Sequence, residues 1–401
     1  MRRQKTYRLC EIVQFNPTER LAKGTIAKKV AMENLHPFTR AISGYELAAY
    51  SGGSKFRNGD TLMARITPCL ENGKTAYVSI LDDEEVGFGS TEYIVFRNFE
   101  GVTDRKFIYY FVSNPWFRNI AIKSMVGSSG RQRVQQSVLE NLEINLPPLA
   151  EQKRIAAILG ALDDKIELNR RINANLEEQA KALFKSWFVD FEPFKDAGFV
   201  DSELGPIPVG WRVGDFTEIV AIKGGGTPKT DVAEYWGGII PFFTPKDVSD
   251  SCYVLKTEKY ITDCGLDHCS SALYKKGTVF ITARGTVGKI VMAGCNMAMN
   301  QTNYALLGKE GINQLFVYNL TIKLADRLLK KSNGAVFNAI TVRDFESEKI
   351  IIPQHDVLLN FGSVVAPIYA MILHHNNQME NLISLRDTLL PKLMSRGINM
   401  E

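Results

Sequence analysis

The sequence predicts an α+β protein in which two similar mixed α/β domains alternate with two long helices. Three observations predict this fold. The chain of 401 residues is long enough for two or three domains. Two segments carry apolar residues about every 3.5 residues, as in a coiled coil, and the whole plan repeats with an offset of about 206 residues. We place the domain boundaries at 1–145, 146–191, 192–352 and 353–401.

The composition is that of an ordinary globular protein. Apolar residues make up 45% of the chain and charged residues 23%, which excludes a disordered or fibrous protein. The six cysteines are scattered and the N-terminus lacks the apolar core of a signal peptide, so we expect reduced thiols and a cytoplasmic location. The longest apolar window, Val357–Leu373, contains Pro367 and is shorter than the roughly 20 residues that span a membrane. We therefore expect a soluble protein with no membrane partner.

The basic excess lies in the first third of the chain. The formal net charge is only +4, but residues 1–150 hold 20 Lys and Arg against 15 Asp and Glu. This excess weakly indicates an anionic partner. It is also typical of an ordinary solvated surface, so charge alone does not identify the partner.

Each globular block contains short β-branched and aromatic runs between Gly, Pro, Asn and Asp, a pattern that predicts strands and turns. The runs correspond in pairs between the two blocks: Leu9–Val13 with Phe216–Val220, Val30–Leu35 with Phe243–Val248, Gly59–Met63 with Gly277–Ile281, Gly73-Lys74 with Gly288-Lys289, and Thr91–Val95 with Thr302–Leu306.

Each block closes with a predicted helix and a polar loop. The helices are expected at 104–123 and 314–331, and the loops at 127–133 and 332–338. We interpret Asn114-Pro115 as a turn that interrupts the first of these helices.

Each block is followed by a segment of roughly 40 residues that predicts a coiled-coil helix about 60 Å long. Asn169 and Asn173, opposite polar positions such as His375, are expected to fix the register of the two helices. Pro367 should kink the second helix or mark a late start for it. The predicted seam residues are Ile155, Leu159, Leu162, Ile166, Leu176, Leu183 and Trp187 in the first helix, and Phe361, Val365, Ile368, Ile372, Met379, Leu382, Leu389 and Leu393 in the second.

No catalytic centre is predicted. Gly73-Lys74-Thr75 lacks the first glycine of a phosphate-binding loop, so we interpret it as a hairpin turn. Asn114–Phe117 is similar to the segment with which adenine methyltransferases hold a flipped base, but the second proline and the methyl-donor loop are missing. Gly224–Pro228 lacks the pattern of a dinucleotide site, and we expect it to be a flexible loop.

A metal site is not expected either. Cys252, Cys264, His268 and Cys269 supply the right residue types, but the chain has no C-x-x-C pair, so ordinary reduced thiols are the preferred interpretation.

Four motifs resemble those of the specificity subunits of type I restriction–modification enzymes, and the resemblance covers essentially the whole chain, in the right order. They are Leu146–Ile155, Leu183–Phe191, Gly205–Trp211 and Leu385–Leu393. The chain departs from the family pattern at Pro367 and after Pro353, where Gln354-His355-Asp356 replaces the Glu-Gln pair found in the first repeat.

The resemblance implies a non-catalytic protein. Such subunits use two target-recognition domains to read the two halves of an asymmetric sequence in double-stranded DNA. Their antiparallel helices set the spacing of the halves and dock two methyltransferase subunits, which use S-adenosylmethionine to modify adenine N6. Motor–nuclease subunits that use ATP and Mg join this complex. No cofactor is expected on the chain itself.

A domain that reads DNA needs cations for the phosphates and amide, hydroxyl or guanidinium groups for the base edges. Arg131, Arg133 and Arg284 are the strongest candidates because a loop guanidinium suits both guanine and phosphate. For each candidate, an exposed side chain that touches no DNA is the alternative. The candidates are Lys28, Lys29, Arg40, Lys55, Arg57, Arg65, Lys74, Ser128, Arg131, Gln132 and Arg133 in the first block, and Thr227, Lys229, Lys246, Arg284, Lys289, Asn300, Gln301, Lys331, Asn333 and Asn338 in the second.

Two other functions stay open at this point. A stand-alone adenine methyltransferase or nuclease would modify DNA without partners. A coiled-coil scaffold that does not bind DNA would show no salt-sensitive affinity for any duplex.

Overall fold

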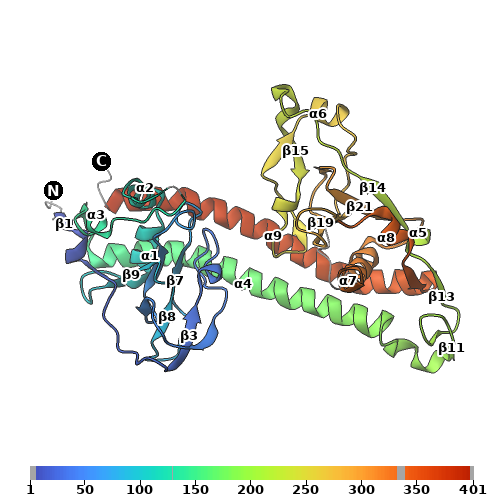
Figure 1. Ribbon diagram of the computed structural model, residues 1–401, viewed down its shortest axis with the longest axis horizontal. Coiled ribbons are helices and arrows are strands. Elements are labelled where there is room, and N and C mark those ends of the chain that lie inside the picture. The colour runs from blue at the N-terminus through green and yellow to red at the C-terminus, as the bar shows by residue number, and fades with distance from the viewer. Residues whose placement is uncertain (1–5, 129, 332–338, 398–401) are drawn as a thin grey trace. The chain divides into compact units, whose positions relative to one another are not determined.

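The computed structural model describes residues 6–128, 130–331 and 339–397. The chain forms two compact units, one made of residues 1–168 with 379–401 and the other of residues 169–378. Each unit contains a mixed α/β domain and part of each of two long helices, α4 (Leu149–Phe188) and α9 (His355–Gly397) (Figure 1). The predicted α+β class is therefore confirmed.

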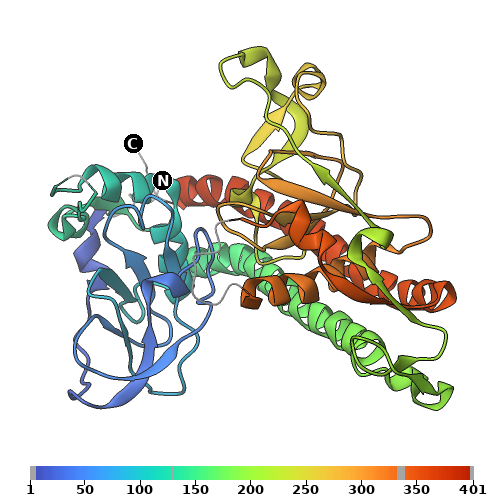
Figure 2. The same ribbon diagram turned by 45° about the vertical axis from the view of Figure 1, so that its right-hand side comes forward.

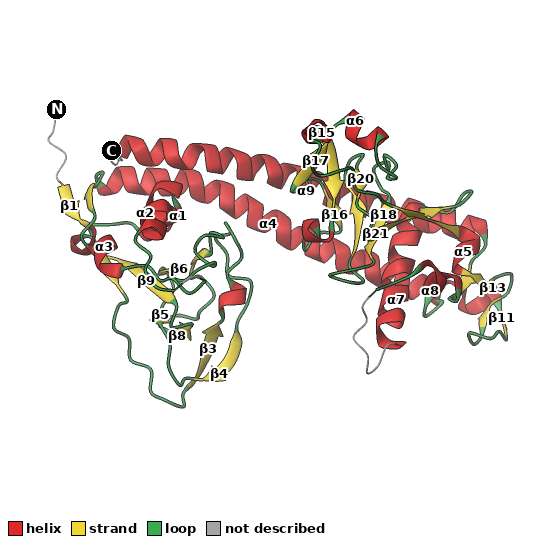
Figure 3. Cartoon of the chain, turned by 45° about the horizontal axis from the view of Figure 1, so that its top comes forward, coloured by secondary structure: helices red, strands yellow, loops and turns green. Residues whose placement is uncertain are grey.

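Short strands joined by long loops build the first domain (Figure 3). The strands are β1 (Thr6–Arg8), β2 (Val13–Phe15), β3 (Ile26–Val30), β4 (Glu46–Ala49), β5 (Lys55–Phe56), β6 (Thr61–Ala64), β7 (Thr75–Tyr77), β8 (Gly87–Gly89), β9 (Tyr93–Asn98) and β10 (Glu143–Asn145). They form one sheet in the order β2-β9-β6-β7, another in the order β4-β3-β8-β5, and the pair β1-β10.

The helical segments of this domain are η1 (Leu9–Glu11), η2 (Met32–Asn34), α1 (Arg105–Ser113), α2 (Pro115–Lys123) and α3 (Gln136–Glu140). The helix predicted at 104–123 is thus split, as the interpretation of Asn114-Pro115 required. Asn114 ends α1, and its side chain accepts a hydrogen bond from the backbone of Trp116 to begin α2. Pro115 occupies the first turn of α2, where its missing N–H costs nothing.

The second domain has the same construction. Its strands are β11 (Phe199–Val200), β12 (Ile207–Pro208), β13 (Arg212–Asp215), β14 (Val220–Gly224), β15 (Trp236–Phe243), β16 (Tyr253–Val254), β17 (Lys259–Ile261), β18 (Val279–Thr282), β19 (Ile290–Ala293), β20 (Ala298–Met299), β21 (Asn303–Gly308) and β22 (Lys349–Ile352). Its helical segments are η3 (Glu192–Ala197), α5 (Phe216–Ile219), η4 (Ala233–Tyr235), η5 (Pro245–Asp247), α6 (Asp263–Asp267), α7 (Gln314–Lys331) and α8 (Val342–Glu346). The bounds of α7 are those predicted.

The strand order confirms the internal repeat. The order β2-β9-β6-β7 of the first domain returns as β14-β21-β18-β19 in the second. Strand β3 pairs antiparallel with β4 and parallel with β8, and β15 pairs in the same way with β17 and β20. The terminal pair β1-β10 corresponds to β13-β22.

Both long helices are continuous ribbons in Figures 1 and 2. In each unit they pair antiparallel. Asp163 of α4 contacts Arg386 of α9 in the first unit, and Asn169 and Asn173 contact Gln378 and Asn376 in the second. Every predicted seam residue is buried or half-buried. The expected polar layer is also present, because the ring Nδ1 of His375 lies 2.8 Å from Asn173 Oδ1.

Pro367 does not delay the second helix. Helix α9 begins at His355, well before Pro367, so the late start that we considered is wrong. The proline ring lies on the exposed face of the helix. There it removes one backbone hydrogen bond without entering the seam.

The motif residues join the helices to their domains. Gln152 is fully buried near the start of α4, where its side chain accepts a hydrogen bond from Asp104 N and donates to the carbonyl oxygens of Val102 and Pro147. At the other end of α4, Phe184 and Phe188 pack against Phe316 of α7 and Phe361 of α9. Burial of these rings makes the end of α4 part of the core of the second unit.

Helix α9 is long and apolar enough, by length and composition alone, to cross a membrane between His355 and Ser395. Much of its most apolar stretch, 44%, is buried inside the protein. Because the core helix of a soluble protein passes the same test, this feature is weak evidence for a membrane span.

Candidate nucleic-acid interface

Two of the three strongest arginine candidates, Arg133 and Arg284, occupy corresponding places in the two domains. In the first domain, the main chain of Arg133 pairs with Ile66, which follows β6. In the second, Arg284 follows the equivalent strand β18 and pairs with Ala339. The repeat therefore places one arginine at the equivalent β-bridge of each domain. In the first domain the arginine is the later residue of the bridged pair, and in the second domain it is the earlier residue.

The loop that carries Arg131 and Arg133 is anchored at its base. Gln132 N donates to Thr67 Oγ1 at 3.0 Å, and Gln132 O accepts from Thr67 N at 3.0 Å. Arg131 is exposed, and its side chain makes no hydrogen bond or ion pair with any residue that the structure describes. A rigid base with a free guanidinium at its tip suits the recognition of an anion or a base edge.

Arg133 is exposed but already paired. Its Nε and Nη2 donate to the carboxylate of Glu92 at 2.6–2.9 Å. These hydrogen bonds raise the pKa of Arg133. The pair is nearly half exposed on the arginine side, so solvent screens it and it adds little to the stability of the fold. A phosphate can therefore replace the carboxylate at little cost.

In the second unit the structure brings two predicted lysines together. Lys246 of η5 and Lys289 of the β18–β19 turn are both exposed, and both line a hollow of about 520 Å³. Glu177 of α4, Ser251 and Tyr318 line the same hollow. Its wall is therefore mainly polar. The domain supplies the two lysines and one carboxylate, Asp250, and the helix supplies a second carboxylate, Glu177.

The segment Gly224–Pro228 is packed, so the expectation of a flexible loop is wrong. Gly226 N donates to Met299 O at 3.0 Å, and a Cβ on Gly225 would come within 2.2 Å of Asn300 O. Only glycine allows the two backbones to approach so closely. Thr227 is exposed and its hydroxyl contacts the Gln301 side chain.

Asn300 and Lys229 have structural contacts of their own. Asn300 Oδ1 accepts hydrogen bonds from the backbone and hydroxyl of Thr302 and from Asn303 Nδ2, which holds the turn before β21. Lys229 is exposed, and its carbonyl oxygen accepts from Trp236 Nε1.

Two other candidates are committed to contacts inside the first unit. Arg40 is 7% exposed and donates to Asp164 at 2.5 Å and to Glu167 at 2.7–2.9 Å, both on α4. Lys28 is 8% exposed and lies 2.9 Å from both Asp82 and Glu85. Because each of these cations is itself buried and would have to leave two carboxylate partners to reach DNA, we omit both from the proposed interface.

The remaining candidate cations of the first block are partly exposed, and each has a hydrogen-bond or ion-pair partner within the domain. Lys29 pairs with Glu46, Lys55 donates to Glu19 O, Arg57 pairs with Glu19, Arg65 donates to Val134 O, and Lys74 donates to Met32 O. Ser128 is exposed. Asn333 and Asn338 lie outside the described residues, as does the side chain of Lys331.

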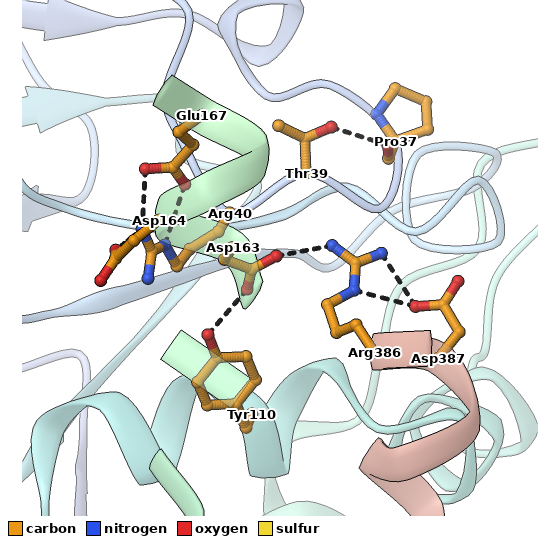
Figure 4. Close-up of polar contacts among 9 residues, drawn as sticks. All are labelled: Pro37, Thr39, Arg40, Tyr110, Asp163, Asp164, Glu167, Arg386 and Asp387. Atoms are coloured by element: carbon orange, nitrogen blue, oxygen red, sulfur yellow. Dashed lines mark hydrogen bonds and ion pairs between the residues drawn. The ribbon is translucent and has the colours of Figure 1, made fainter. Parts of the chain in front are cut away.

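Sequence reasoning missed the buried polar junction between the first domain and the helices. Arg386 donates to Asp163 across the seam, and Tyr110 of α1 donates to the same carboxylate (Figure 4). An arginine at a seam position was the available signal, because a buried guanidinium needs a partner. The identity of that partner depends on tertiary contacts.

Among the described residues, no three or more His, Cys, Asp or Glu side chains lie together as the ligands of a metal ion would. Cys264 Sγ lies 3.7 Å from His268 Nδ1. Cys252 is buried, and burial beside Glu177 raises the pKa of its thiol.

Two copies of one α/β domain on a shared pair of helices define this chain as a tandem-repeat protein. A family model described as "Type I restriction modification DNA specificity domain" matches residues 2–178 and 208–357. The chain therefore belongs to the type I restriction–modification DNA specificity family.

Individual relatives agree with this assignment. The chain is 29% identical over 318 residues to the MjaIX specificity subunit of Methanocaldococcus jannaschii, covering 76% of this chain and 72% of the relative. It is 23% identical over 404 residues to the HindI specificity subunit of Haemophilus influenzae, covering 85% and 87%. A crystal structure of the type I restriction–modification S subunit from M. genitalium shares the fold, with a TM-score of 0.59 and 15% identity over 97% of this chain and 95% of that one.

Proposed function

We propose that this chain is the DNA-specificity subunit of a type I restriction–modification complex, with each domain reading one half of a two-part DNA site. The observation that carries the proposal is the repeated domain with an arginine, Arg133 or Arg284, at the same β-bridge in each copy. The functional segments are proposed to be 1–145 and 192–352 for recognition, and 146–191 and 353–401 for the helices that set the half-site spacing.

The chemistry of recognition follows from the accessible groups. Arg131 and Arg284 are exposed, and neither side chain makes a hydrogen bond or ion pair with the described residues; we propose that both contact guanine or phosphate. Arg133 would exchange the Glu92 carboxylate for a phosphate. Lys246 and Lys289, together in one hollow, would hold the backbone of the second half-site.

The chain acts without chemistry of its own in this proposal. Two methyltransferase subunits would dock on the helices and use S-adenosylmethionine to modify adenine N6 in each half-site. Motor–nuclease subunits would add ATP- and Mg-dependent translocation and cleavage. Because the partner subunits carry out catalysis in this proposal, this chain has only to bind the DNA and to hold the two recognition domains in place.

The proposal is tested by methylome sequencing of cells that express the chain with its methyltransferase partner. We expect one asymmetric motif with two specific halves and a fixed spacer. Arg131→Ala should weaken the base preference of one half, and Arg284→Ala that of the other. The matched control is Arg154→Ala, which removes an exposed arginine of α4 paired with Glu151. Equal loss at both halves from each single variant would contradict the domain assignment.

The purified chain distinguishes the alternatives. Affinity for the duplex should fall steeply as salt rises, because bound phosphates release counterions. Affinity independent of salt would favour a protein scaffold. Methylation of DNA by the chain alone would show that it carries a catalytic centre and would refute the proposal.

A further inference from the structure

In the first unit, one buried carboxylate joins the recognition domain to both long helices. Tyr110 Oη of α1 donates to Asp163 Oδ2 of α4 at 2.7 Å, and Arg386 Nη1 of α9 donates to Asp163 Oδ1 at 2.8 Å (Figure 4). Asp163 is 2% exposed and Tyr110 is 1% exposed. Burial, with the charge of Asp163 beside it, raises the pKa of Tyr110, so the phenol remains a donor.

The second unit has a hydrogen bond at the equivalent place. Asn319 of α7 donates through Nδ2 to Tyr369 Oη of α9 at 2.9 Å, and both residues are buried. Asp163 and Tyr369 are related by the repeat offset of 206 residues. Tyr110 and Asn319 are also equivalent, because each is the third residue after the matching phenylalanine, Phe107 or Phe316, in the helix that closes its domain.

Both repeats have a hydrogen bond between the recognition domain and a long helix at this place, but the two side chains that form it differ between the repeats. A tyrosine on the domain meets an aspartate on the helix in one copy, and an asparagine on the domain meets a tyrosine on the helix in the other. A buried polar pair adds little stability compared with apolar packing of the same volume. Its distinctive property is direction, because a hydrogen bond at 2.7–2.9 Å weakens steeply when its angle changes.

We propose that Tyr110–Asp163 and Asn319–Tyr369 are positioning pairs that mount each recognition domain on its helix at a fixed orientation, and thereby fix the spacer between the half-sites. This inference rests on the proposed function. The pairs contact no DNA themselves. They act through the orientation of the loops that do, so they affect the spacing of the halves and leave the bases read within each half unchanged.

The test compares Tyr110→Phe and Asn319→Leu with controls from the same helices. Tyr109→Phe removes a buried hydroxyl of α1 that lies in the field of Asp163 but has no hydrogen bond to either long helix among the described residues, so it controls for loss of a nearby phenol hydroxyl. Thr321→Val removes a buried hydroxyl that bonds only within α7, to Val317 O. Each variant is assembled with the methyltransferase partner, and methylation is sequenced on a DNA library with randomised half-sites and spacers.

We expect Tyr110→Phe and Asn319→Leu each to lower the preference for the native spacer over spacers one base pair longer or shorter by about tenfold, which corresponds to about 1.4 kcal/mol. The base preferences should stay as in the wild type, and the controls should keep the native spacer. An unchanged spacer preference in the two test variants, or an equal loss in the controls, would overturn the inference.

A second measurement separates positioning from folding. Thermal unfolding is followed for every variant, and a spacer effect counts only where the transition remains cooperative. If one of Tyr110→Phe and Asn319→Leu does not fold, the other carries the test alone, and an unchanged spacer preference in that variant would overturn the inference. A wild-type complex without any sequence preference would instead contradict the proposed function.

Discussion

Replacing Asp163 with alanine should destabilise the first unit strongly. The carboxylate is 2% exposed and its two oxygens serve Arg386 and Tyr110, so the substitution leaves a buried guanidinium with only the half-exposed Asp387. Breaking a buried pair by removing one partner costs about 3–5 kcal/mol. At roughly 2–4 °C per kcal/mol for a unit of this size, the unfolding midpoint should fall by about 6–20 °C.

The double substitution Asp163→Leu with Arg386→Met supplies the decisive comparison. It removes both charges and fills the space, so it should lie within about 2 kcal/mol of the wild type. Both variants are measured by denaturant unfolding, with Glu178→Ala/Lys181→Ala as the control for loss of an exposed pair on α4. If the double variant is as unstable as Asp163→Ala, the cost lies in packing and not in an unpaired charge, and the reasoning fails.

Three further outcomes are expected. Insertion of seven residues into α4 between Ile166 and Leu176 should change the preferred spacer in methylome sequencing, and an unchanged spacer would reject the helices as its determinant. Iodoacetamide at neutral pH should modify exposed Cys10 well before Cys252, whose burial raises its pKa; equal labelling in the native protein by mass spectrometry would contradict this. Burial raises the pKa of Glu19, but hydrogen bonds from Arg97 and a second arginine outweigh it and lower the pKa below 4.5. Glu19 therefore stabilises the fold above about pH 4.5 and loses this effect as the pH falls through the lowered pKa. The difference in unfolding midpoint between the wild type and Glu19→Gln should shrink on acidification, and a constant difference would count against this pairing.

The local sequence pattern was enough to predict the helices that close each domain. Helix α7 has the predicted bounds because its limits depend on local apolar periodicity, and α1 and α2 separate at Asn114-Pro115 because proline cannot continue a helix. The repeat added long-range information, since a run recognised in one block identified its counterpart in the other.

The candidate interface was less predictable because a single sequence does not show which charges meet. Arg40 and Glu167 are 127 residues apart in the chain, yet the fold joins them in a part-buried ion pair. A cation used inside the protein has the same sequence signature as a cation that faces DNA. The exposure of Arg131 could be predicted because it follows a glycine in a polar loop, whereas the partner of Arg133 could not be predicted.

The differing chemistry of the two junctions limits how freely the halves can be exchanged. A chimaera that carried the second recognition domain in the first position would bring Asn319 against the acidic side chain at 163 in place of a phenol. The reverse graft would set the phenols of Tyr110 and Tyr369 against each other in a space that holds one. We therefore expect whole-domain exchange to preserve the junction best when the helix residue at 163 or 369 is exchanged together with its domain.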